Sequence, residues 1–344
     1  MKKIETISPS QIAMLKTCRL KLLHYKQYGE KGYSDHPSTV LGNLIHKMYE
    51  IASSKKLDDQ SFEKHWKEEL AKASAQYFKN ELNLIYSPIE FWAPYYSIKK
   101  GQTKKIILKS AKEPAPNKNS KKGEGFYVEQ SFKYGVLKGK PDSVYVKDGY
   151  SRLIDFKTGP IYKKQGNQYV IKDEYKIQLK AYGFLVMKKK KISAPRINLI
   201  LQQVNGQRTE PINFSNEEYE NFYYEAKASI DEINNYVDSN SIDLLGSPSE
   251  SNCKFCLFKP KCHSFLSYLD ANNVPYAVII ETPDEIISTN NGIRFHDFYL
   301  WGIPPNTELE IRGVGKKKVL ICNLSKSNSN NTYYWKKQSQ VYII

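Results

Sequence analysis

Apolar and polar positions divide the chain into a helical first part, a middle part of short strands and a second alternating region at the end. The pattern that begins at Ser8 is a helix start, and it predicts one helix from Ser8 to Tyr28 that contains Cys18. A second helix is expected near Val40, and it carries His46. Its apolar residues recur at helical spacing: Leu41, Leu44, Ile45, Met48 and Tyr49.

The next segment is helical in pattern but poor in apolar residues. From Leu57 to Tyr86 only a thin apolar stripe is present, and residues 99–122 then hold nine lysines against the single acid Glu113. A lysine-rich stretch of this kind is typical of an exposed connection. We therefore treat 51–122 as a helical and lysine-rich insertion.

The middle part predicts an α/β arrangement. Short strands are expected at 126–132, 136–137, 143–146 and 153–156, a helix at 175–187 and a further strand at 196–204. Another helix, 217–237, begins after Ser215, with Glu218 three residues on as a capping box. Strands followed by a crossover helix and another strand favour a central sheet flanked by helices.

The last 70 residues form a separate pattern. Strand candidates centre on Val278, Leu309, Val319 and Tyr342. They predict a small β-rich C-terminal unit over 269–344, next to a main domain over 1–268.

Charge narrows the range of partners. Lysine and arginine number 52 against 36 acidic residues, which gives a net charge of +16 and favours a polyanion such as DNA. The sequence has no stretch of about 18 apolar residues, so we expect no membrane span. Its N-terminus lacks the apolar segment of a secretory signal. We expect a soluble intracellular protein, cytoplasmic or nucleoid-associated.

Two acidic residues and a lysine form the strongest chemical pattern. Asp142 closes Gly139-Lys-Pro-Asp, and Asp155-Phe-Lys157 follows after twelve residues. Side chains alternate along a strand, so Asp155 and Lys157 share one face. If the strand after Asp142 pairs with the strand of Asp155, both carboxylates converge on one cation. Such oxygen ligands suit Mg²⁺ or Mn²⁺.

These motifs resemble the RecB-like branch of the PD-(D/E)xK nucleases. In that branch G-x-x-x-H on a helix precedes G-x-x-D, D/E-x-K and a helix with Q-x-x-x-Y. The chain has the same order in Gly42 to His46, Gly139 to Asp142, Asp155 to Lys157 and Gln178 to Tyr182. The likeness covers about residues 5 to 268 and implies a restriction-endonuclease-like mixed sheet.

The resemblance also implies a role for each residue. His46, Asp142 and Asp155 would hold the divalent ion, with the backbone carbonyl of Phe156, and Lys157 would be the catalytic lysine. Two further residues would position DNA: Gln178 and Tyr182. Glu129 matches an acidic position often found before G-x-x-D, although a solvent-facing glutamate explains it equally well. The remaining candidates have no motif: His24, His36, His65, His296 and Cys322.

Three cysteines lie close together at 253–262. Cys253, Cys256 and Cys262 could hold one metal, with Cys18 or His263 as the fourth ligand, and their spacing leaves zinc and iron–sulfur open. A subset of RecB-like nucleases, including AddB-type helicase–nucleases and CRISPR adaptation nucleases, has one cysteine before the nuclease motifs and three after them. Similarity to that subset implies a [4Fe-4S] cluster here, with zinc as the alternative.

The expected function is metal-dependent DNA cleavage. Exonuclease action or trimming of ends and flaps, chiefly on single-stranded DNA, fits the resemblance best, in recombination, repair, replication or defence. The chain has no phosphate-binding loop of the helicase type, so any unwinding partner is expected to be a separate chain. Two alternatives remain: a catalytically degenerate nucleic-acid-binding subunit and a zinc-stabilised RNA-processing factor.

Overall fold

The computed structural model divides the chain into two compact units. The first contains Met1–Lys16 and Tyr25–Asp238, and the second contains Thr17–His24 and Ser239–Ile344. The structure describes residues 1–28, 37–79, 87–110, 125–128, 130–203, 209–254, 256–272, 274–281, 283–296, 298–327, 331–336 and 339–344. None of the helices in these ranges has the length and apolar character needed to cross a membrane.

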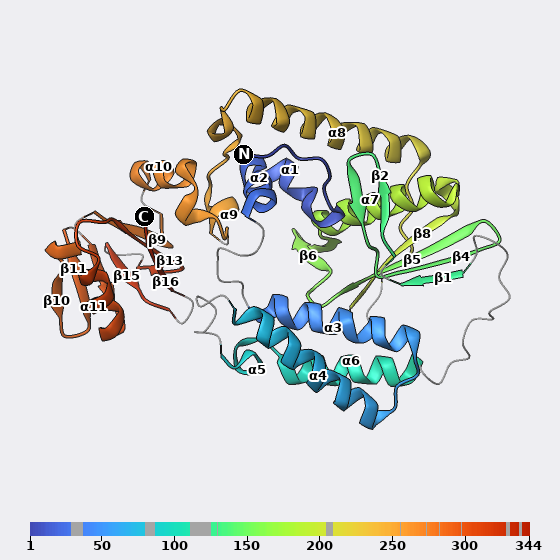
Figure 1. Ribbon diagram of the computed structural model, residues 1–344, viewed down its shortest axis with the longest axis horizontal. Helices are drawn as coiled ribbons and strands as arrows, with labels where there is room; N and C mark the ends of the chain where they lie inside the picture. Colours follow the sequence, from blue (N-terminus) through green and yellow to red (C-terminus); the bar gives the residue numbers. More distant parts are fainter. Residues whose placement is uncertain are drawn as a thin grey trace. The chain divides into compact units, whose positions relative to one another are not determined.

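A four-stranded mixed sheet is the centre of the first unit (Figure 1). Its strands lie in the order β1 (Gly125–Val128), β4 (Ser143–Lys147), β5 (Tyr150–Lys157) and β8 (Ile197–Gln203). The first three are antiparallel, and β8 runs parallel to β5. Two hairpins accompany the sheet: β2 (Phe132–Tyr134) with β3 (Leu137–Gly139), and β6 (Tyr162–Gln165) with β7 (Gln168–Ile171).

Helices cover both faces of this sheet. Neighbouring residues on a strand point to opposite faces, and Phe156 stacks on Tyr49 of α3 (Pro37–Ser54) while Lys157 meets Gln178 of α7 (Asp173–Lys190). Figure 1 shows α3 on one side of the sheet and α7 on the other. Helix α8 (Asn216–Asp238) packs along α7.

The capping box predicted for α8 is confirmed. Ser215 N donates to Glu218 Oε2 at 2.8 Å, and Glu218 N donates to Ser215 Oγ at 3.1 Å. These reciprocal bonds satisfy donors that the first turn of the helix leaves free.

The segment 51–122 supplies three further helices. They are α4 (Asp59–Tyr77), α5 (Ile89–Trp92) and α6 (Tyr96–Ser110), and they bury Phe62, Trp66 and Ile107 against α3. The helical character predicted for this segment is therefore confirmed in its described residues, and its status as an insertion stays a prediction. The expectation of an exposed lysine-rich connection is wrong for its first part, because α6 carries those lysines. Residues 111–124 lie outside the described residues.

The N-terminal helix is interrupted where one helix was predicted. The chain forms a 3₁₀ turn, η1 (Pro9–Gln11), then α1 (Ala13–Thr17) and α2 (Arg19–Tyr28), with Cys18 in the break. Asn252 Nδ2 donates to Thr17 O at 3.2 Å, so this carbonyl is engaged by a side chain distant in sequence. The bond offers a physical reason for the break, since a carbonyl bound elsewhere is less available to the helix.

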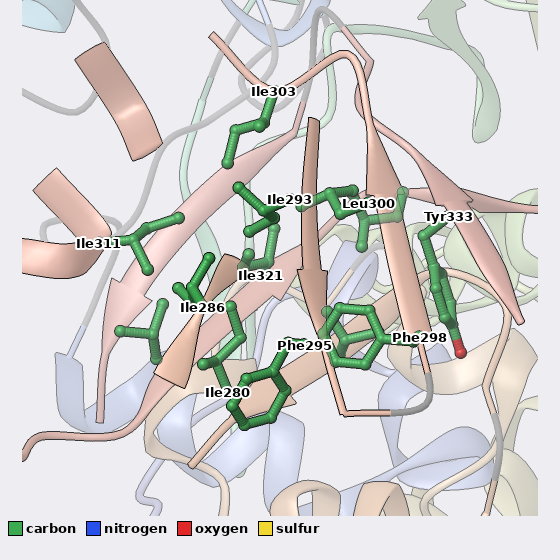
Figure 2. Packing of buried hydrophobic residues seen from close by; sticks show 13 residues of the cluster. Ile280, Ile286, Ile293, Phe295, Phe298, Leu300, Ile303, Ile311, Ile321 and Tyr333 are labelled. Carbon is green, nitrogen blue, oxygen red and sulfur yellow. The ribbon is translucent and has the colours of Figure 1, made fainter. Parts of the chain in front are cut away.

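The second unit contains two small sheets. One has the order β16 (Gln340–Ile343), β13 (Val319–Cys322) and β9 (Ala277–Ile280). The other has the order β10 (Ile287–Thr289), β11 (Gly292–Phe295), β12 (Phe298–Trp301), β15 (Thr332–Tyr334) and β14 (Ser325–Lys326). Figure 2 shows apolar side chains from both sheets packed in one core. The strand predicted around Leu309 is wrong: Pro304 and Pro305 begin helix α11 (Pro305–Gly313) there.

The cysteine segment belongs to the second unit. Its short helices are η4 (Ile242–Leu245), α9 (Glu250–Cys253), η5 (Lys259–Lys261) and α10 (His263–Ala271). Cys253 and Phe265 pack against Tyr276, Leu320 and Cys322 in a second buried cluster. This packing explains why the cysteine segment is grouped with the C-terminal strands. The predicted boundary at residue 268, between a nuclease domain over 1–268 and a β-rich domain over 269–344, stays a prediction.

Candidate active site

Strand pairing places the two aspartates side by side. Ser143 pairs with Ile154 in the antiparallel ladder, so Asp142, one residue earlier, stands opposite Asp155. Phe156 N donates to Asp142 Oδ2 at 2.6 Å, which fixes the Asp142 carboxylate at the end of β5. The predicted pairing of these strands is therefore confirmed, and two carboxylates lie at one position on the sheet.

Asp155 is the most buried polar group of the site. Its side chain is 3% exposed, and Lys157 Nζ lies 2.6 Å from Oδ2. The ammonium approaches outside hydrogen-bonding angles, so Oδ2 remains without a hydrogen-bond donor. Burial raises the pKa of Asp155 to about 6, although the charge of Lys157 opposes the rise, and the negative charge of Asp142 adds to it.

Helix α3 brings His46 to the carboxylates. His46 Nδ1 lies 3.1 Å from Asp142 Oδ1, and the imidazole is about one-third exposed. Burial alone would lower the pKa of His46, but the hydrogen bond to Asp142 and the charges of Asp142 and Asp155 outweigh it and raise the pKa. The imidazole is thus held by an anion and remains accessible from the pocket.

Helix α7 holds the lysine. Lys157 Nζ donates to Gln178 Oε1 at 2.7 Å and lies 4.8 Å from the centre of the Tyr175 ring. Gln178 therefore orients Lys157, while Tyr182, four residues on, is 7% exposed and lines the same pocket. Tyr175 was not predicted, although its position three residues before Gln178 puts it on the same helical face.

Gly139 permits the close approach of these elements. A Cβ at Gly139 would lie 2.7 Å from Pro9 Cδ and 3.0 Å from Tyr182 Cε1. The motif glycine Gly42 differs, because its nearest neighbour would be Thr158 Oγ1 at 3.6 Å, an ordinary contact. The space at position 139 therefore admits only glycine, whereas position 42 has room for a Cβ.

Six of the predicted nuclease residues line one open pocket of about 490 Å³, and Phe156, predicted to contribute its carbonyl, is not among the lining residues. The pocket is lined by His46, Asp142, Asp155, Lys157, Gln178 and Tyr182 together with Ser10, Asn43, Lys47, Glu50 and Lys140. Glu50 was not predicted, yet it stands four residues after His46 on α3, so helical spacing could have indicated it. Glu129 lies outside the described residues.

The donor set fits a divalent cation. Asp142 and Asp155 supply oxygens, His46 supplies a nitrogen, and one oxygen of Asp155 is buried without a hydrogen-bond donor. Among the residues that the structure describes, no three His, Cys, Asp or Glu side chains already stand in a metal-binding array. Lys157 instead supplies the positive charge beside Asp155.

The four predicted cluster cysteines surround one cavity in the second unit. Cys18, Cys253, Cys256 and Cys262 line a cavity of about 20 Å³, and His263 is not among its lining residues. Burial raises the pKa of Cys253 and of Cys256, and it raises the pKa of Cys262 to about 12. Thiols in this state are protonated unless a cation compensates the thiolate charge.

Of the candidates without a motif, those that the structure describes are not among the lining residues of the nuclease pocket. His24 is buried and stacks on Phe258 at 5.5 Å. His65 lies 3.3 Å from Glu68, and His296 lies 3.2 Å from Glu285. Cys322 is fully buried, and His36 lies outside the described residues.

Comparison with known proteins gives one family match. A family model described as the PD-(D/E)XK nuclease superfamily matches residues 6–263. No curated protein matches the chain. The mixed sheet flanked by helices confirms the restriction-endonuclease-like fold class that was predicted.

Two solved structures are distantly similar. The "Putative exonuclease" of Eubacterium rectale is 13% identical with a TM-score of 0.43, and the match covers 78% of this chain and 89% of that one. The protein SSO0001 is 16% identical with a TM-score of 0.31, over 77% and 89% of the two chains. The family model spans 258 of the 344 residues and includes the whole pocket, so this chain belongs to the PD-(D/E)XK nuclease superfamily.

Proposed function

We propose that this chain is a metal-dependent DNA nuclease with its active site in the pocket of Asp155. One observation carries the proposal: a fully buried carboxylate oxygen of Asp155 has no hydrogen-bond donor and stands beside a second carboxylate, Asp142. Burying this carboxylate costs the fold stability, because the attraction of Lys157 at 2.6 Å does not offset the burial and the pKa of Asp155 stays raised. A site that binds a cation explains the arrangement.

Three side chains would hold the cation: His46, Asp142 and Asp155, with the Phe156 carbonyl as a fourth candidate ligand. PD-(D/E)XK nucleases generally use divalent metals such as Mg²⁺. Such an ion lowers the pKa of bound water and stabilises negative charge on phosphate. The choice between Mg²⁺ and Mn²⁺ is left to the assay below, since oxygen donors suit both.

The remaining side chains orient the reactants. Lys157 Nζ, fixed by Gln178 Oε1, can donate a hydrogen bond to the attacking water or to a phosphate oxygen, where its charge opposes the developing negative charge. Tyr182 lines the same pocket and would help to position the strand. We also assign substrate contact to Lys140, an exposed cation at the pocket.

DNA with free or single-stranded ends is the proposed substrate, in recombination, repair, replication or defence. The net charge of +16 supports a polyanionic partner. A separate helicase would supply unwound strands, and the protein would act in the cytoplasm or at the nucleoid. A degenerate DNA-binding subunit would bind without cutting, and an RNA-processing factor would prefer RNA.

Cleavage of end-labelled single- and double-stranded DNA tests the proposal. Asp155→Asn and Lys157→Ala should abolish cleavage in Mg²⁺ or Mn²⁺, while wild type in EDTA should bind without cutting. Asp231→Asn is the matched control, because Asp231 pairs with Lys227 on the exposed side of α8. Unchanged cleavage by Asp155→Asn would refute the assignment, and cleavage of RNA in preference to DNA would favour the RNA-processing alternative.

We further propose that Cys18, Cys253, Cys256 and Cys262 hold a [4Fe-4S] cluster. The proposal is supported by the position of all four thiols around one cavity, with Lys21 and Lys259 nearby. Thiolate ligands suit iron–sulfur and zinc alike, so metal analysis after anaerobic purification decides between them. Cys256→Ala should release the metal and Cys322→Ala should not. Stoichiometric zinc without iron would replace the cluster by the zinc alternative.

A further inference from the structure

The five-stranded sheet of the second unit has one face in the core. Along β11 and β12 the residues Ile293, Phe295, Phe298 and Leu300 point inward, and Tyr333 of β15 joins them (Figure 2). Because side chains alternate along a strand, the residues between them face the other way. The strand register therefore defines a second face.

This outer face carries two cross-strand rows. The first row pairs Ile287 with Arg294, Arg294 with Tyr299, and Tyr299 with Thr332. The second row pairs Thr289 with Gly292, Gly292 with Trp301, Trp301 with Tyr334, and Tyr334 with Ser325. Three aromatic residues thus come together on two adjacent strands: Tyr299, Trp301 and Tyr334. We call them the aromatic face.

Two rings of the aromatic face are open to solvent, and contacts with Trp301 and Thr289 fix the third ring, that of Tyr299. Trp301 is 44% exposed and Tyr334 is 42% exposed. The rings of Tyr299 and Trp301 meet edge to face, 5.7 Å between centres, and the Tyr299 hydroxyl lies 2.7 Å from Thr289 Oγ1. Large apolar rings kept exposed by ordered neighbours form a surface suited to stacking.

The residue opposite Trp301 on β11 is a glycine. Gly292 is its cross-strand partner, and a Cβ at Gly292 would lie 2.1 Å from Leu300 O. Only glycine fits there, so no side chain from β11 covers the indole at this position.

Charge selects the kind of partner. None of the five strands contains Asp or Glu, whereas Arg294 stands beside Tyr299 on the outer face. Among the described residues no ion pair engages Arg294. A guanidinium next to exposed rings matches a ligand that carries both phosphate charge and flat bases.

We propose that the aromatic face binds single-stranded DNA, with bases stacked on Trp301 and Tyr334 and a phosphate near Arg294. This inference rests on the proposed nuclease function for the choice of DNA. It adds a binding surface in the second unit that takes no part in the chemistry. Stacking on every base has a similar strength, so the face binds without a marked sequence preference.

Fluorescence anisotropy of a labelled oligothymidine in EDTA tests the proposal without any cleavage. Each of Trp301→Ala and Tyr334→Ala should weaken binding about tenfold, from the usual contribution of one stacked base. Trp301→Phe should stay within roughly threefold of wild type, because it keeps a stacking ring. Leu309→Ala is the control in the same unit, since Leu309 is exposed on α11. Thermal unfolding verifies that each variant is folded.

Binding by Trp301→Ala and Tyr334→Ala that equals wild type would overturn the inference. Tighter binding of the matching oligouridine would overturn the choice of DNA. An absence of nucleic-acid binding by wild type would overturn the inference as well and would favour a protein as the partner of the aromatic face. The test separates this inference from the proposed function: Asp155→Asn should lose cleavage and keep binding. If wild type never cleaves but loses binding with Trp301→Ala, only the nuclease proposal fails.

Discussion

Replacing Asp155 by asparagine removes a buried charge while keeping the shape of the side chain. Two effects oppose each other in the metal-free protein. The substitution relieves the cost of burying a carboxylate whose Oδ2 accepts no hydrogen bond, but it also removes the ion-pair partner of Lys157. The raised pKa of Asp155 shows which effect is larger: the cost of burying the carboxylate charge exceeds its attraction to Lys157. We therefore expect Asp155→Asn to stabilise the metal-free protein.

The size of the effect follows from that pKa. A rise from 3.8 to about 6 corresponds to about 3 kcal/mol. The native state holds the proton more tightly than the unfolded chain, so the wild-type protein loses this stability as the pH rises from about 4 to about 6. Above that range the full cost is present. This rise already includes the opposing attraction of Lys157, so about 3 kcal/mol is the expected size of the effect of Asp155→Asn at pH 8.

Thermal unfolding in EDTA at pH 5 and pH 8 measures the difference. At roughly 2–4 °C per kcal/mol for a unit of this size, Asp155→Asn should unfold up to about 10 °C above wild type at pH 8, and by a smaller margin at pH 5. Mn²⁺ should raise the unfolding temperature of wild type and leave Asp155→Asn unmoved. A variant less stable than wild type at pH 8 would refute the reasoning, and Asp231→Asn provides the exposed control.

Three further predictions concern other parts of the chain. Gly139→Ala should lower the unfolding temperature, since overpacking against Pro9 typically costs about 1–3 kcal/mol. Gly42→Ala should leave the unfolding temperature unchanged or raise it, because a Cβ there makes only an ordinary contact. Equal effects of the two substitutions would contradict the geometry. Native Cys322 should resist iodoacetamide at pH 8, because burial raises its pKa to about 11, and peptide mapping should find it modified only in urea. Ser215→Ala should cost about 1 kcal/mol in urea unfolding by removing the cap of α8, and no loss would argue against the capping box.

The placement of the candidate site residues could be predicted because it depends on short-range geometry. Asp155 and Lys157 share a face through strand alternation, and the short loop between two strands brings Asp142 to Asp155. Similarly, Gln178 and Tyr182 share a helical face. Each of these relations links residues within one strand, one helix or one strand pair, which is the range where periodicity is informative.

The errors arose where distant residues decide the structure. The break at Cys18 is associated with Asn252, whose side chain engages the carbonyl of Thr17. The error around Leu309 has a local cause instead: its residues alternate like a strand, but Pro304 and Pro305, a few residues earlier, fix a helical start. Cross-strand pairing in the second unit, which creates the aromatic face, joins segments separated by loops of unequal length, so no local pattern announces it.

Helix α7 links the fold to the chemistry. It is buried on nearly all sides from Leu179 to Met187, so its sequence lacks a polar stripe there, and only its first turns reach the pocket. A helix packed in this way cannot shift without disturbing the core. Its Gln178 accepts a hydrogen bond from Lys157 and so fixes the position of the lysine. On the opposite face of β5, Tyr49 of α3 stacks on Phe156 at 4.4 Å. Helices α3 and α7 thus contact β5 from opposite faces and fix its position. The free-energy cost of burying the Asp155 carboxylate therefore falls at a position where a bound cation would offset it.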